Sequence, residues 1–132
     1  MQISELMTKN VITLAPDSPI LDHISIFTDN KIHHIPVQDA TGEVVGMVSS
    51  KDFENYSNIT RILEAKEDQP ILVKDIMTEP IFAYFENVEV YQAAQAMIDN
   101  HLHAIVVVNL KEVMTGILTS TDLLQYIVEQ RK

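Results

Sequence analysis

The sequence predicts a mixed α/β (α+β) fold of two β-α-β-β-α repeats that pack together with pseudo-twofold symmetry. Length and composition give the first indication: 132 residues, 46% of them hydrophobic, suffice for the core of one small domain. An internal repeat gives the second, because a shift of 70 positions aligns residues 3–56 with residues 73–126 without a gap, with eleven identical pairs. Each copy alone has too little interior to bury its apolar face, so we expect the copies to pack on one another.

Each copy begins with a short helical turn, predicted at residues 3–8 and 73–78. A brief extended stretch follows at residues 11–13 and 81–83. These two elements are short, and they are predicted mainly because the same pattern occurs in both copies.

A longer helix is predicted next. In the first copy Asp17 is its capping residue and Pro19 its first helical residue, and in the second copy Asn87 takes the capping position. Asn30 and Asn100 stand where a left-handed residue commonly ends a helix. Helical spacing predicts the buried faces, which comprise Ile20, Ile24 and Phe27 in the first copy and Val90, Ala94, Met97 and Ile98 in the second.

Two strands and a closing helix complete each copy. The strands are predicted at residues 33–38 and 43–49, and at residues 104–109 and 113–119. The composition of residues 39–42 is typical of a turn, and the closing helices are predicted to start at Ser50 and Ser120. We therefore expect repeat 1 at residues 1–57, a solvated linker at 58–72 with a turn or two of helix at 60–65, and repeat 2 at 73–130.

Composition and charge exclude several classes of function. The formal net charge is −10, whereas nucleic acids and anionic lipid surfaces are bound through clustered positive charge. Cysteine is absent, so disulfides, zinc-thiolate sites and cysteine nucleophiles are excluded. The first ten residues lack the pattern of a signal peptide, and no apolar run approaches the roughly 20 residues of a membrane helix. We expect a soluble, cytoplasmic protein that binds neither nucleic acid nor membrane.

The most informative pattern is a string that runs from Gly46 to Asp52 and again from Gly116 to Asp122. Both strings contain glycine, two apolar residues, a hydroxyl residue, two variable residues and aspartate. This pattern predicts a strand that ends at the hydroxyl residue, followed at once by a helix whose N-terminus offers unpaired N–H groups. A carboxylate in that first turn can accept hydrogen bonds from both hydroxyls of a ribose. Ordinary helix capping would explain a single string, but two copies in the same phase favour a binding function.

The chain resembles a tandem pair of CBS (cystathionine β-synthase) domains, also called a Bateman module. The resemblance covers residues 3 to 129 and implies two clefts between the copies, which in this family commonly bind AMP, ADP, ATP or S-adenosylmethionine. It is carried by Leu6-Met7-Thr8 and Ile76-Met77-Thr78, by the runs from Val11 to Asp17 and from Ile32 to Val37, and by the two Gly-to-Asp strings.

The resemblance implies a role for each residue that matches the family pattern. Asp52 and Asp122 would hold the ribose diols, and Ser49 and Thr119 would bond ribose or phosphate. Val11 and Thr13 would flank adenine in one cleft, and Ile81 and Ala83 would do so in the other. His33 and His103 would face phosphate.

The sequence departs from the family in its basic residues. The arginine common near the second strand is absent, and neutral histidine is a poor phosphate anchor at pH 7. Lys51 is the only cation in either closing string, and Thr121 takes its place in the second. We therefore expect the Asp52 cleft to accept phosphate better than the Asp122 cleft.

Other chemistry is disfavoured. His33-His34 and the pair His101 and His103 lack accompanying ligands for a metal, and Ser49 and Ser50 lack the Gly-x-Ser-x-Gly elbow of a serine hydrolase. We expect no metal site, no required cofactor and no enzymatic activity.

The predicted function is regulatory. An adenosine nucleotide or S-adenosylmethionine would bind between the copies, shift their orientation and change the affinity for an effector protein. The family resemblance also implies a homodimer that packs through its helices, with Leu124 and Ile127 as candidate interface residues. The alternative is a dimerisation or interaction scaffold that binds no small molecule.

Overall fold

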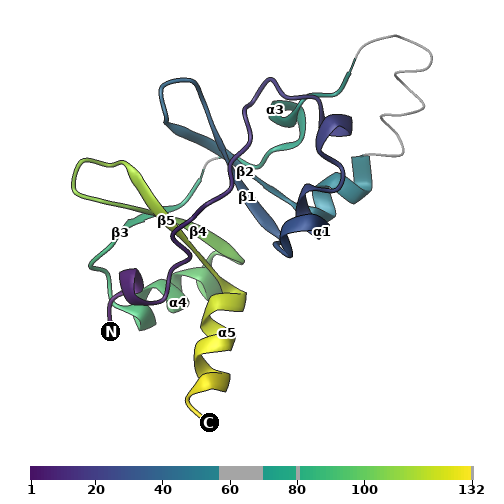
Figure 1. The fold of residues 1–132 in the computed structure, drawn as a ribbon. Helices are drawn as coiled ribbons and strands as arrows, with labels where there is room; N and C mark the ends of the chain where they lie inside the picture. Colours follow the sequence, from purple (N-terminus) through teal and green to yellow (C-terminus); the bar gives the residue numbers. More distant parts are fainter. Residues whose placement is uncertain (57–69, 80, 132) are drawn as a thin grey trace. The chain divides into compact units, whose positions relative to one another are not determined.

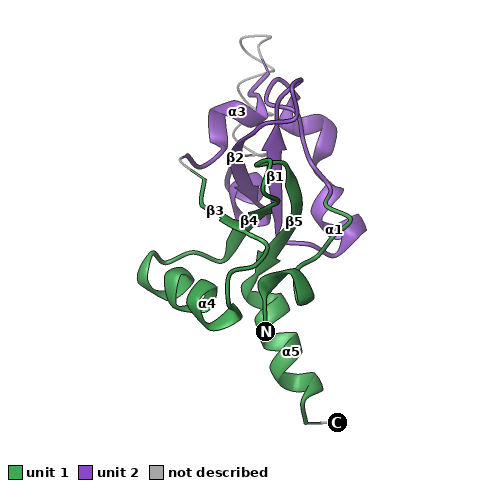
Figure 2. Cartoon of the chain, turned by 90° about the vertical axis from the view of Figure 1, so that its left-hand side faces the viewer, with its two compact units in different colours: residues 1–11, 81–132 green, residues 12–80 purple. Residues whose placement is uncertain are grey.

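The computed structural model describes residues 1–56, 70–79 and 81–131. The chain forms two compact units (Figure 2). Unit 1 consists of Met1–Val11 and Ile81–Lys132, and unit 2 of Ile12–Pro80. Both units combine helices with a small sheet, which confirms the α+β class (Figure 1).

The units do not follow the sequence repeats. The opening turn of the first copy belongs to unit 1, together with most of the second copy. The opening turn of the second copy belongs to unit 2, together with most of the first. Each unit is therefore completed by a segment from the other repeat.

Unit 1 is built on a three-stranded sheet in the order β3-β4-β5, with β3 parallel to β4 and β4 antiparallel to β5. Its strands are β3 (Ala83–Phe85), β4 (Ala104–Val108) and β5 (Met114–Thr119), and its helices are η1 (Ile3–Glu5), α4 (Val90–Asp99) and α5 (Ser120–Glu129). The core gathers Ile3, Ala93, Met97, Ile105, Val107 and Leu118. Helix and sheet side chains thus close around one apolar centre.

The opening segment is an integral part of unit 1. Ile3 is fully buried, and its backbone N–H donates to the carbonyl of Val88 at 2.9 Å. Thr8 and Ile117 exchange two backbone hydrogen bonds, of 2.8 and 3.0 Å, so the segment extends the sheet beyond β5 by one bridge.

Unit 2 contains an antiparallel pair of strands, β1 (His34–Gln38) and β2 (Val44–Ser49). Its helices are η2 (Ile20–His23), α1 (Ile26–Asn30), a helix described at residues 50–56, and α3 (Val73–Ile76). Phe27 and Phe53 meet edge to face with ring centroids 5.1 Å apart, and Val73 from the second repeat is fully buried in the same cluster.

The predicted helix starts are wrong in both copies. Pro19 is the N-cap of the 3₁₀ helix Ile20–His23 rather than the first helical residue, and the α-helix begins only at Ile26. Asp17 instead pairs with Lys74 at 2.9 Å, a partner 57 positions away that local spacing does not reveal. In the second copy α4 begins at Val90 with Glu89 as N-cap, not Asn87.

The helix ends also differ from the prediction. The left-handed residues are Lys31 (φ 54°) and His101 (φ 55°), one position later than expected. Asn30 and Asn100 remain at the helix end, where each side-chain amide donates to the carbonyl four residues earlier at 2.8 Å. They therefore help to terminate the helix without adopting the left-handed conformation.

Two further predictions need correction. Ile98 is 68% exposed, because the face of α4 that packs on the sheet carries Ala93 and Met97, four residues apart. Residues 11–13 form no strand, and the adjacent Leu14 makes one isolated bridge, to Val37. The four main strands lie within one residue of their predicted bounds, and the helix expected at residues 60–65 falls outside the described residues.

Candidate functional site

Both closing strings fold as a strand that leads directly into a helix. In unit 2, β2 ends at Ser49 and the next residue is helical. In unit 1, β5 ends at Thr119 and α5 begins at Ser120. In both units the helix starts beside the first residue of the neighbouring strand. Ser49 pairs with His34, the first residue of β1, and Thr119 pairs with Ala104, the first residue of β4.

The unit 2 junction holds its carboxylate in a fixed position. The backbone N–H of Ser49 donates to Oδ2 of Asp52 at 3.0 Å, and the backbone N–H of Asp52 donates to Oγ of Ser49 at 3.1 Å. This reciprocal capping box orients the side chain from both ends. Among the described residues no partner contacts Oδ1 of Asp52, so this half-buried carboxylate keeps free acceptor capacity.

The unit 1 junction repeats the capping box and adds one contact. Thr119 and Asp122 exchange hydrogen bonds of 2.9 and 3.1 Å. The hydroxyl of Thr8 also donates to Oδ1 of Asp122 at 3.2 Å. The sequence prediction does not include Thr8 among the site residues. Its identity with Thr78 in the repeat is the feature of the sequence that could have pointed to it.

The two predicted phosphate-facing histidines lie at the same junctions. The backbone N–H of Ser50 donates to the carbonyl of His33, and that of Ser120 to the carbonyl of His103, both at 2.9 Å. The Nδ1 atom of His33 also lies 3.4 Å from Oγ of Ser50. Lys51 is exposed in the first turn of the following helix, so unit 2 gathers more positive charge at its junction than unit 1.

The surroundings of Asp122 are acidic. Asp122 lines a pocket of about 200 Å³ in unit 1 together with Glu5, Leu6, Gln125, Tyr126 and Glu129. Two further carboxylates at this pocket disfavour a phosphate there by repulsion, and which of the two junctions accepts phosphate better stays a prediction.

The predicted adenine-flanking residues are divided between the units. Ala83, Ile81 and Val11 belong to unit 1, and Thr13 to unit 2. Ala83 pairs with Val106, which lies two residues along β4 from Ala104, the partner of Thr119. Their contact with adenine stays a prediction.

The glycines of the two strings lie inside β2 and β5, and residues of the opening segments pack directly against them. A Cβ atom on Gly46 would overlap the Met77 side chain. A Cβ atom on Gly116 would meet the Met7 sulfur at 2.5 Å and the Thr8 backbone oxygen at 2.8 Å. The close approach that glycine permits is thus with protein atoms of the same unit.

The sequence matches the CBS domain family twice, over residues 3–58 and 73–129. The chain belongs to the CBS domain family. The tandem CBS pair implied by the sequence resemblance is therefore confirmed. Within residues 1–56, 70–79 and 81–131, no group of three or more metal-ligating side chains comes together, and no helix there has both the length and the apolar character to cross a bilayer.

Two curated relatives illustrate the sequence similarity. Inosine-5'-monophosphate dehydrogenase of Methanocaldococcus jannaschii is 29% identical over 121 residues, which cover 92% of this chain and 22% of that enzyme. Protein MK0525 of Methanopyrus kandleri is 23% identical over 123 residues, which cover 93% of this chain and 61% of that protein. The chain thus spans about a fifth and about three fifths of their lengths.

Solved CBS structures show the same fold. The CBS domain pair of protein MJ0100, in complex with 5'-methylthioadenosine and S-adenosyl-L-methionine, has a TM-score of 0.82 at 22% identity and covers 98% of both chains. CBSX2 in complex with AMP has a TM-score of 0.80 at 19% identity over 99% of this chain and 98% of that one. The CBS domain of a bacterial CNNM/CorC family Mg²⁺ transporter with ATP has a TM-score of 0.81 at 20% identity, over 97% and 87%.

Proposed function

We propose that this CBS pair is a regulatory module, without enzymatic activity, that binds an adenosine-containing ligand in the cytoplasm and transmits its presence to an effector protein. The observation that carries the proposal is the pair of capped carboxylates, Asp52 and Asp122, at equivalent strand-to-helix junctions. The ligands in the three solved CBS structures, 5'-methylthioadenosine with S-adenosyl-L-methionine, AMP and ATP, share the adenosine group and support this choice.

The ribose diol is the part of the ligand that the carboxylates would recognise. A carboxylate offers about four lone-pair sites, and at Asp52 the hydrogen bond from the backbone N–H of Ser49 uses one of them. Two ribose hydroxyls can therefore donate to Asp52 without breaking the capping box. At Asp122 the Thr8 hydroxyl takes a second site, so a ligand there shares the carboxylate with Thr8.

The phosphate preference would differ between the two sites. Lys51 and His33 lie at the Asp52 junction, whereas Glu5 and Glu129 share the pocket of Asp122. We therefore assign AMP, ADP or ATP to the Asp52 site. A ligand without phosphate, such as S-adenosylmethionine with its positive sulfonium, suits the acidic Asp122 site.

A screen by thermal shift and calorimetry tests the proposal, with AMP, ADP, ATP and S-adenosylmethionine as ligands and GTP as the control. We expect a saturable stabilisation with at least one adenosine ligand and none with GTP. Asp52→Ala should weaken nucleotide binding by about 1.5–3 kcal/mol, the scale for a charged hydrogen-bonding group. Unchanged affinity in both Asp52→Ala and Asp122→Ala would remove the ribose role from these residues.

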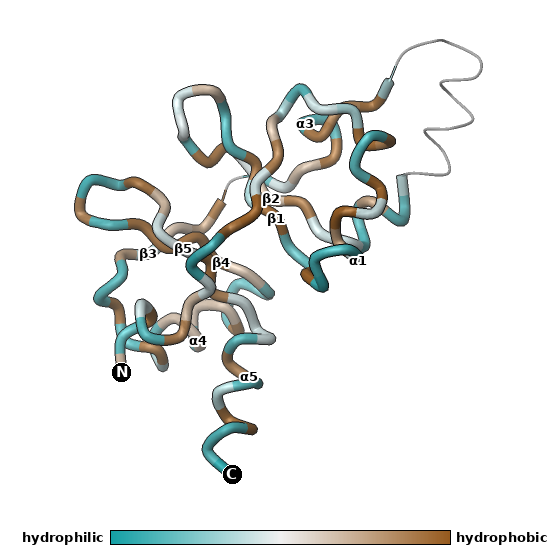
Figure 3. Tube along the Cα trace, in the orientation of Figure 1, coloured by the Kyte–Doolittle hydropathy of each residue, from teal (hydrophilic) through white to brown (hydrophobic). Residues whose placement is uncertain are grey.

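We also propose that the protein is a homodimer that packs through α4 and α5. Helix α5 alternates hydrophobic and hydrophilic residues along its length (Figure 3), and its side chains Leu124, Ile127 and Val128 are 63%, 61% and 59% exposed. Ile98 on α4 is 68% exposed. Light scattering of Leu124→Glu should report a monomer.

A stable dimer together with no stabilisation by any ligand in the screen would favour the scaffold function instead.

A further inference from the structure

Three positions at the tip of the β4–β5 hairpin and the end of β3 carry larger apolar or more apolar side chains than the first copy. At equivalent positions of the repeat, Phe85 stands where the first copy has alanine, Leu110 where it has alanine, and Val113 where it has glutamate. These three side chains are 41%, 86% and 55% exposed. Packing of the core therefore does not account for them, since large apolar side chains in water contribute little to folding.

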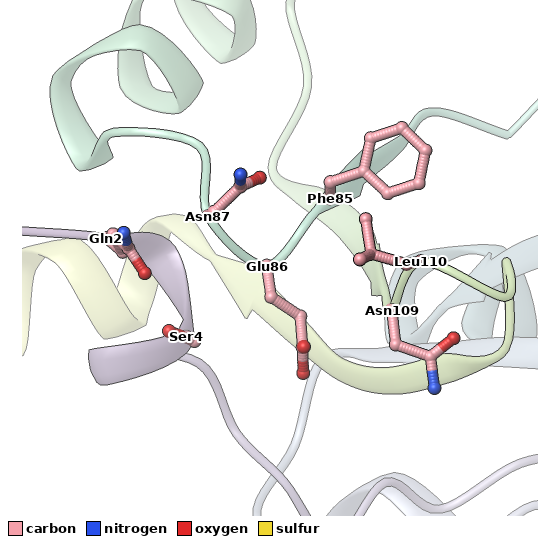
Figure 4. A pocket seen from close by; sticks show the side chains of 7 residues that line it. All are labelled: Gln2, Ser4, Phe85, Glu86, Asn87, Asn109 and Leu110. Atoms are coloured by element: carbon pink, nitrogen blue, oxygen red, sulfur yellow. The ribbon is translucent and has the colours of Figure 1, made fainter.

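Two of these side chains line a pocket of unit 1. Phe85 and Leu110 share a cavity of about 230 Å³ with Glu86 and with the polar side chains of Gln2, Asn87 and Asn109 (Figure 4). The cavity is smaller than the roughly 300–1,000 Å³ of sites that enclose a small-molecule ligand. It is the right order of size for one or two side chains of a protein partner.

The charge of the pocket defines the partner further. In Figure 4 the Glu86 carboxylate extends away from the Phe85 ring and the Leu110 side chain. Glu86 is half-buried, and among the described residues it has no ion pair. Its charge favours a cationic group on the partner. A second copy of this chain fits poorly, because the residues that line this pocket include no cation, so the same patch on a second copy offers none to Glu86.

The hairpin turn keeps a second carboxylate beside the apolar tip. Glu112 adopts a left-handed conformation with φ 62°, where the first copy has Gly42 with φ 90°. Glycine takes this conformation without strain, whereas glutamate does not. Glu112 therefore adds an exposed carboxylate to the hairpin tip, beside the exposed Lys111.

The tip lies at the opposite end of the strands from the proposed ribose site. Thr119 pairs with Ala104 at the junction, whereas Met114 pairs with Val108 at the hairpin end. Four residues of β4 separate these ends, about 13 Å at the usual rise of a strand. A partner at the tip would therefore leave Asp122 accessible while it contacts the same two strands.

We propose that Phe85, Glu86, Leu110, Glu112 and Val113, here named the hairpin surface, form the docking site for an effector segment that alternates apolar and basic side chains. The apolar side chains would pack on Phe85 and Leu110, and the basic ones would pair with Glu86 and Glu112. The inference rests on the proposed function only in that a regulatory module needs an effector.

The test is a titration followed by ¹H–¹⁵N NMR, with a capped seven-residue peptide that alternates leucine and arginine as the probe. Two control peptides alternate leucine with glutamate and serine with arginine. We expect saturable shifts at residues 85–86 and 110–113 with the leucine–arginine peptide, and binding at least tenfold weaker with each control. Equal binding of a control peptide, or equal shifts at the first-copy turn, residues 39–43, would overturn the proposal.

A turn exchange supplies the matched variant. Leu110→Ala, Lys111→Thr, Glu112→Gly and Val113→Glu together install the turn of the first copy, which removes two exposed apolar side chains and moves the carboxylate from position 112 to 113. A second variant, Glu86→Gln, removes the charge of the pocket. Each variant should bind the leucine–arginine peptide at least tenfold more weakly, while Glu43→Gln in the first-copy turn should leave the affinity unchanged. Undiminished binding of the peptide to the exchanged turn would overturn the proposal. NMR shifts at residues 85–86 and 110–113 that change with protein concentration in the absence of peptide would overturn it as well, because they would indicate a second copy as the partner.

The same samples separate this proposal from the proposed function. The turn exchange should retain the thermal shift that AMP or S-adenosylmethionine gives the unaltered protein, because the junctions lie at the other strand ends. Absence of a ligand shift in the unaltered protein, with peptide binding intact, would count against the adenosine site alone.

Discussion

Removal of the Ile3 side chain should destabilise the half of the protein that contains the second repeat. Ile3 is fully buried in unit 1, although it belongs to the first repeat by sequence. Ile3→Ala deletes three carbon atoms, which at about 0.8 kcal/mol each gives about 2.4 kcal/mol of lost transfer free energy. The cavity left behind raises the expected loss in the free energy of unfolding to about 3–4 kcal/mol.

Amide hydrogen exchange locates the effect, and urea unfolding measures its size. In Ile3→Ala we expect faster exchange in β4 and β5 of unit 1, with β1 and β2 of unit 2 less affected. Val73→Ala is the matched variant, because Val73 is the repeat counterpart of Ile3 and is fully buried in unit 2. It should show the converse pattern. Loss of protection mainly in β1 and β2 of Ile3→Ala would refute the exchange of opening segments.

Three further predictions concern the turns and the glycines. Gly116→Ala should lower the free energy of unfolding by about 1–3 kcal/mol in urea denaturation, because its Cβ would meet the Thr8 backbone oxygen at 2.8 Å; unchanged stability would contradict that packing. Glu112→Gly should raise stability by up to about 1 kcal/mol through relief of its positive φ, and a loss would contradict the strain argument. The Thr41 hydroxyl, followed by backbone N–H groups, lowers the pKa of Asp39 below 3.8, so its stabilisation of the turn is present above the unfolded-state pKa and is lost as the pH falls through the folded-state pKa. NMR of the turn amides should show this loss below about pH 4 and none in Asp39→Asn, whereas equal behaviour of both proteins would contradict it.

The repeat made the strand pairs and closing helices predictable. Each of these elements has a regular pattern over five to ten residues, and the Gly-to-Asp strings mark the point where β2 and β5 end. The capping boxes at Asp52 and Asp122 follow from the same local spacing, which places a hydroxyl residue three positions before a carboxylate. Local chemistry decides these features, so a sequence without structure can reveal them.

Long-range contacts explain what the sequence did not predict. Asp17 pairs with Lys74 rather than capping a helix, and Thr8 reaches Asp122 across 114 positions. The opening turns of the two copies are similar in sequence, so the pattern alone does not tell which copy each one completes. Ile98 continues the apolar spacing of α4 yet lies on the exposed face, because only the packed sheet decides which stripe is buried.

The recognition of the ribose by Asp52 and Asp122 is the central claim, and a pair of calorimetric titrations tests it most directly. AMP and its 2',3'-dideoxy analogue differ only in the two hydroxyls that the carboxylates would accept. We predict that the dideoxy analogue binds the unaltered protein at least tenfold more weakly, as expected when hydrogen bonds to a charged group are lost. In Asp52→Ala the two ligands should bind almost equally. Equal affinity of both ligands for the unaltered protein, with measurable AMP binding, would contradict the account.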